Sequence, residues 1–94
     1  MNEQAIADMA PKLKALANEG RLMVVALLLK HGELSVSELN ESIPLSQSAL
    51  SQHLAVLRRE EMVTTRRASQ TIHYRNTKNT EVLYRAVMAT HDPA

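Results

Sequence analysis

The chain has 94 residues, which is enough for one domain, so the sequence predicts a single domain over residues 1–94. Hydrophobic residues make up 45% and charged residues 22%, a balance typical of a folded globular protein and not of a disordered one. The formal net charge is only +1, and no cysteine is present, which excludes disulfides, thiolate metal sites and cysteine redox switches.

The N-terminal residues lack the features of an export signal. They mix acidic, amide and lysine side chains, with no basic segment followed by a continuous apolar one. The longest apolar run, Leu22 to Leu29, is far short of the roughly 20 residues that cross a bilayer. We therefore expect a cytoplasmic protein without a membrane partner.

Charge is distributed unevenly along the chain. Residues 1–42 carry four basic and six acidic side chains, whereas residues 43–79 carry six basic and two acidic ones. A cluster of positive charge in one half of a small domain favours contact with a polyanion such as double-stranded DNA.

The first half of the chain predicts two helices. Apolar residues at helical spacing indicate one helix that runs to about Ala17. Because proline disrupts a helix interior, we expect this helix to bend at Pro11 and not to begin there. Asn18 is a suitable N-cap for a second helix over about residues 19–30.

Two closely spaced helices follow in the middle of the chain. Ser35 and Glu38 match a capping box that opens a short helix, and the Ile43–Pro44 pair ends it. Ser46 then caps a helix over 46–59. Two helices separated by so few residues predict a helix-turn-helix.

The pattern changes beyond Met62. Residues 63–65 and 72–74 are rich in β-branched and aromatic types, which predicts a two-stranded hairpin within 62–76. Thr80 is then expected to cap a last helix. The predicted fold is mainly α with a small β-hairpin, built from five helices and two strands.

Helix 46–59 has one apolar side and one small, polar side. The apolar side carries the leucines at positions 50, 54 and 57. The polar side combines short side chains, which permit close approach, with amide and guanidinium groups that pair with base edges in a major groove. The candidate DNA-binding residues of this helix are Ser46, Gln47, Ser48, Ser51, Gln52 and Arg59. An ordinary solvent-exposed face is the alternative interpretation.

Further basic and polar residues lie near the end of this helix and on the hairpin. Arg58, Arg66, Arg67 and Gln70 are candidates for contact with phosphates or a minor groove, and solvated surface is again the alternative. His53 projects nearer the apolar side of its helix, so we expect it to be packed or directed at a phosphate. It is kept as a weaker DNA-binding candidate.

Enzymatic and metal-binding roles are not indicated. Ser51 and His53 are two positions apart on a helix and face different ways, which argues against a nucleophile and base pair. The other histidines have no partner at metal-ligand spacing. We expect no catalytic site, no metal and no cofactor.

Both ends of the chain carry apolar stripes that suit either the core or a subunit interface. We favour a homodimer interface, because a core this small does not need so much apolar surface. The interface candidates are Ile6, Met9, Leu13, Leu83, Tyr84, Val87 and Met88.

The segment LSQSALSQHLAVLRREEMVTTRRASQTIHY resembles the recognition helix and wing of the ArsR/SmtB family of bacterial repressors, and LKALANEGRLMVVALL and GELSVSEL resemble the helices before them. The resemblance covers roughly residues 12–76. It implies a winged helix-turn-helix that dimerises through its first and last helices, binds an inverted-repeat operator as a repressor, and is released by an inducer.

The chain departs from that family at its sensor sites. Where arsenic sensors of the family carry cysteines, this chain has Ser35 and Ser37, and Ala26 stands where oxidant sensors have a cysteine. The inducer is therefore expected to be neither a thiolate-bound metal nor a cysteine oxidant. Three alternatives are left open: a small organic ligand bound between the subunits, a partner protein, or no inducer at all, with regulation through the protein's own abundance. The alternative function is a winged-helix adaptor that binds protein without specific DNA binding.

Overall fold

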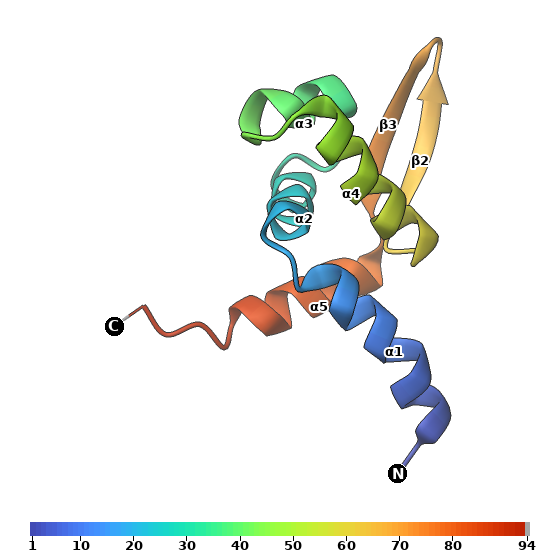
Figure 1. The fold of residues 1–94 in the computed structure, drawn as a ribbon, viewed down its shortest axis with the longest axis vertical. Coiled ribbons are helices and arrows are strands. Elements are labelled where there is room, and N and C mark those ends of the chain that lie inside the picture. The colour runs from blue at the N-terminus through green and yellow to red at the C-terminus, as the bar shows by residue number, and fades with distance from the viewer. Residues whose placement is uncertain (94) are drawn as a thin grey trace.

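The computed structural model describes residues 1–93, within which five helices form the body and a β-hairpin projects from one side of it, beside α4 (Figure 1). The elements, in chain order, are α1 (Glu3–Leu16), α2 (Glu19–His31), β1 (Leu34–Ser35), α3 (Val36–Ser42), α4 (Gln47–Arg59), β2 (Val63–Ala68), β3 (Thr71–Asn76) and α5 (Lys78–Met88). The prediction of a mainly helical fold with a hairpin is confirmed.

The predicted capping residues set the starts of three helices. The Asn18 side chain accepts from the Arg21 amide at 3.1 Å, and Ser46 accepts from the Ala49 amide at 3.1 Å. Ser35 and Glu38 form both bonds of a capping box. Each cap satisfies amides that a first helical turn leaves without intrahelical partners, so these starts follow from local sequence.

One predicted helix start was wrong. Thr77, not Thr80, is the N-cap of α5; Thr80 lies in the first turn, is buried, and donates its hydroxyl to the Met62 carbonyl at 2.7 Å. Thr80 thus connects α5 to the residue that precedes the hairpin through a buried hydrogen bond. Helix α1 begins at Glu3 and contains Pro11 in its interior, so the prediction that this helix does not begin at the proline is confirmed.

The sheet has three strands where two were predicted. The short strand β1 pairs with β3 through Leu34 and Tyr74, which gives the order β1-β3-β2. A two-residue strand has no period of its own, so only its partner defines it. It anchors the hairpin to the loop that follows α2.

The core lies beneath α4. Leu50, Leu54 and Leu57 of this helix are almost completely buried, as their spacing predicts, and they pack with apolar residues of the neighbouring helices. Those partners are Ala15, Leu16, Val24, Val25, Leu28, Leu39, Ile43, Met62 and Val63. The polar side of α4 therefore faces outward.

The junction after α4 turns the chain directly into the hairpin. The Met62 amide donates to the Leu57 carbonyl at 2.9 Å and the Glu61 amide to the Arg58 carbonyl at 3.0 Å, with Glu61 at φ 58°. This pattern is a Schellman motif, in which the residue after the cap is left-handed. It fixes where the hairpin leaves α4.

Helix α1 extends away from the body and crosses near α5 (Figure 1). Its buried residues, Ala15 and Leu16, are both in its last turn. None of the helices in residues 1–93 has the length and apolar character needed to cross a membrane.

Candidate nucleic-acid interface

The outer face of α4 presents the polar residues that the sequence singled out. Ser46, Gln47, Ser48, Ser51, Gln52, Arg58 and Arg59 are all exposed. Because the leucines opposite are held in the core, this face is fixed in direction by packing. It offers amide groups and hydroxyls on a rigid helix.

The hairpin separates its two adjacent arginines. Side chains alternate along a strand, so Arg66 and Arg67 lie on opposite faces of the hairpin. Arg67 is on the face of Val63 and Asn76, which are buried against the helical core. Arg66 is on the other face, directly opposite His73. Arg67 is exposed, as is Gln70 in the turn.

Arg66 is engaged by a carboxylate that sequence reasoning missed. Its guanidinium donates to the Glu33 carboxylate, with an Nη2–Oε1 distance of 2.5 Å and Nε–oxygen distances of 3.2 Å. Arg75 lies near the same carboxylate, its Nε 3.8 Å from Oε2. Hydrogen bonding by Arg66 lowers the pKa of Glu33, and the same bond raises the pKa of Arg66.

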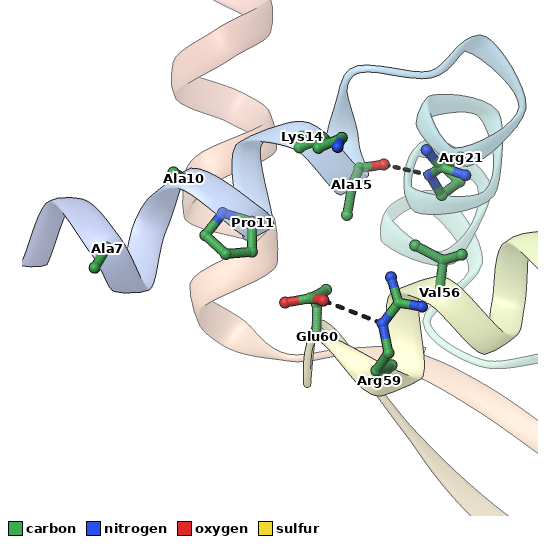
Figure 2. A pocket seen from close by; sticks show the side chains of 9 residues that line it. All are labelled: Ala7, Ala10, Pro11, Lys14, Ala15, Arg21, Val56, Arg59 and Glu60. Atoms are coloured by element: carbon green, nitrogen blue, oxygen red, sulfur yellow. Dashed lines mark hydrogen bonds and ion pairs between the residues drawn. The ribbon is translucent and has the colours of Figure 1, made fainter.

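His53 packs inward from α4, the first of the two roles expected for it. Its Nδ1 lies 3.1 Å from Nη1 of Arg21. The Nε of Arg21 in turn donates to the Ala15 carbonyl at the end of α1, as Figure 2 shows. The His53 ring also approaches Gly20. Arg21 thereby links α1, α2 and α4, a role that nothing in the sequence spacing indicates.

The packed position of His53 predicts a specific pH dependence of stability. Burial, and then the nearby Arg21 charge, lower the pKa of His53 below its ordinary 6.5. The unfolded chain therefore takes up this proton first, so the stability it contributes is full above about pH 6.5 and is lost as the pH falls through the folded-state pKa. The pKa values of Glu33 and Glu38 are lowered from 4.5, so these two carboxylates change the stability only in more acidic solution.

We expect His53→Gln, which keeps an acceptor for Arg21 but does not titrate, to flatten this dependence. Urea unfolding at about pH 7.5 and about pH 5.5 should show a larger loss of unfolding free energy for the parent chain than for the variant. Equal losses in both proteins would contradict the assignment to His53.

A cavity of about 570 Å³ lies between α1, α2 and the end of α4 (Figure 2). Arg59 lines this cavity, and its Nε lies 3.2 Å from Oε2 of Glu60. Lys12 of α1 donates to the Glu60 carbonyl at 2.5 Å. Arg59 is thus at the α1 end of the polar face, farthest along the helix from Ser46.

The apolar stripes of α1 and α5 are only partly covered. Ile6, Leu13 and Met88 are 56%, 47% and 44% exposed, and Met9 and Val87 are also exposed. Leu83 and Tyr84 instead pack partly against the core. Val82, 61% exposed, was not among the expected residues. In residues 1–93 no three histidine, aspartate or glutamate side chains gather as a metal site.

Comparison with known proteins gives consistent matches. The model of the "bacterial regulatory protein, arsR family" matches residues 18–65. The transcriptional activator HlyU of Vibrio cholerae is 58% identical over 62 residues, 66% of this chain and 56% of that protein. The nodulation protein NolR of Rhizobium meliloti is 50% identical over 62 residues, 66% of this chain and 50% of that protein.

The similarity extends to the fold over nearly the whole chain. The solved structure of HlyU from Vibrio cholerae superposes with a TM-score of 0.86 at 42% identity and covers 96% of this chain and 98% of that one. The sequence matches to the two curated relatives, by contrast, span only about half of their length.

Proposed function

Because the chain belongs to the arsR family of bacterial regulatory proteins, a family of transcription regulators and not of enzymes, we propose that it is a dimeric, sequence-specific repressor of transcription. The observation that carries the proposal is the exposed polar face of α4, which the buried leucines hold outward beside the hairpin. Its site of action is the cytoplasm.

In this proposal, α4 enters the major groove and the hairpin acts as the wing. Gln47 and Gln52 pair with base edges, for which the side-chain amide matches adenine, while the serine hydroxyls bind bases or phosphates. Arg58 and Arg67 bind phosphates. His53 does not read bases; with Arg21 it positions α4.

The proposed dimer pairs the exposed apolar faces of α1 and α5. A symmetric dimer presents two copies of α4, which suits an inverted repeat with half-sites about 34–36 Å apart, one turn of DNA. The signal that releases the protein acts without cysteine, because the chain has none. Among the relatives, HlyU is named an activator and a Xylella fastidiosa protein a repressor, so a reporter gene must establish the direction of regulation.

The test is binding to labelled DNA from upstream of the chain's own gene, against a scrambled duplex, at several salt concentrations. We expect the specific duplex to bind at least about a thousandfold more tightly. Gln52→Ala should weaken specific binding by about 1–3 kcal/mol and reduce preference at one position of each half-site.

Gln4→Ala is the matched control, since Gln4 is an exposed glutamine of α1 whose amide donates, among residues 1–93, to Asp8 alone. It should leave DNA binding unchanged. If the upstream DNA shows no discrimination, selection from random duplexes follows. Failure there as well would reject the repressor and favour the adaptor function.

A further inference from the structure

Glu33 lies where the wing meets the rest of the domain. It is in the loop between α2 and β1, and the pairing of β1 with β3 holds that loop against the hairpin. Its side chain is only 21% exposed, whereas those of Arg66 and Arg75 are 58% and 62% exposed. The carboxylate is therefore the fixed partner, and the two arginines are the groups free to reorient.

One face of the hairpin thus carries two arginines whose charge is partly neutralised by one carboxylate. Arg66, His73 and Arg75 project from this face, and Glu33 is the acidic side chain that bonds to it. On the opposite face Arg67 is exposed and has no ion pair in residues 1–93. The two adjacent arginines therefore differ in availability.

We infer that Glu33 limits the sequence-independent DNA affinity of the wing by holding Arg66, and more weakly Arg75, away from phosphates. The inference rests on the proposed function. Arg67 is then the arginine of the wing that binds a DNA phosphate, whereas Arg66 stays paired with Glu33.

Glu33 and a DNA phosphate compete for the same guanidinium, and this competition determines how much Glu33 lowers the DNA affinity. An exposed ion pair is weak, but while it holds, the Nε–Nη2 edge of Arg66 faces Glu33 and is not available for bidentate binding of a phosphate. Each additional phosphate contact releases counterions and steepens the dependence of log K on log salt by about 0.9. Phosphates carry no sequence information, so a freed arginine strengthens binding to any duplex by the same factor.

The test is Glu33→Gln, which keeps the shape of the side chain and removes its charge. We expect it to strengthen binding to both the upstream and the scrambled duplex by about 3- to 10-fold, with a salt dependence steeper by about 0.9 to 1.8. Glu41→Gln is the matched control. Glu41 is an exposed carboxylate of α3 with no ion pair in residues 1–93, and removing its charge should change affinity less than about twofold.

A second pair of variants tests the same inference without altering Glu33. Arg67→Gln should weaken binding to the scrambled duplex by about 3- to 10-fold, whereas Arg66→Gln should weaken it less than about twofold. In the Arg66→Gln background, Glu33→Gln should lose most of its effect. Thermal unfolding of each variant establishes that it is folded.

The outcomes separate the inference from the function on which it rests. If the parent chain fails to discriminate among duplexes, including those selected at random, the proposed repressor function is rejected. If the parent discriminates but Glu33→Gln binds no more tightly than Glu41→Gln, the inference alone is overturned. Equal losses for Arg66→Gln and Arg67→Gln would overturn it independently.

Discussion

Replacing Leu13 by glutamate is expected to leave a folded monomer that binds DNA at least about a hundredfold more weakly than the parent chain. Leu13 is 47% exposed on α1 and is not part of the core, so its loss removes little packing within one subunit. In the proposed dimer a buried glutamate without a partner opposes association. A monomer binds one half-site and loses the gain from two linked contacts.

Sedimentation of the two proteins at equal concentration measures the first part, and binding to the specific duplex measures the second. Ser37→Glu is the control, because it adds the same charge at an exposed position of α3, outside the proposed interface. It should remain dimeric. A Leu13→Glu protein that sediments with the mass of the parent would show that α1 does not form the interface.

The features predicted from sequence are those set by residues close together in the chain. The side chains of Ser35 and Ser46 accept from amides three residues on, and the Glu38 side chain accepts from the Ser35 amide three residues back. The helical spacing of the α4 leucines likewise predicts which side of that helix is buried. The helix-turn-helix and the hairpin followed from these signals alone, because caps and periodicity are local.

The features that were missed depend on contacts between distant residues. Glu33 and Arg66 are 33 positions apart, and Arg21 and His53 are 32 apart, so no spacing rule joins them. Thr80 has a residue type that suits a cap, but its hydroxyl bonds Met62 across the fold. One missed feature could have been predicted. Side chains alternate between the two faces of a strand, so adjacent arginines such as Arg66 and Arg67 must lie on opposite faces of the hairpin.

Gly20 is a second residue from which a distant contact could have been predicted. Its replacement tests the contact between α2 and α4. The chain has two glycines. A glycine inside a helical pattern indicates either that the helix tolerates it or that another part of the chain packs closely against that position. A Cβ at Gly20 would lie 2.9 Å from Nε2 of His53 and 3.1 Å from Cδ1 of Leu45. The first distance is shorter than real Cβ contacts, so the His53 ring must shift, whereas the second requires Leu45 to give by only a few tenths of an ångström.

We expect Gly20→Ala to lower the free energy of unfolding by about 1–3 kcal/mol, the usual range for overpacking. The His53 ring is held by Arg21 and cannot turn away without losing that bond. Because His53 is on α4, the strain also displaces the polar face, and specific DNA binding should weaken more than scrambled binding does. Urea unfolding and the two-duplex assay measure these effects.

A double-mutant cycle locates the strain. His53→Ala removes the ring that a Cβ at position 20 would meet, although it leaves Arg21 without its partner on α4. In that background Gly20→Ala should cost less than it does in the parent, so the two losses should add to more than the loss in the double variant. Additive losses would place the strain at Leu45 instead. In that case Gly20→Ala should weaken specific DNA binding by the same factor in the His53→Ala background as in the parent chain. The residue that it displaces would then be Leu45, which precedes α4.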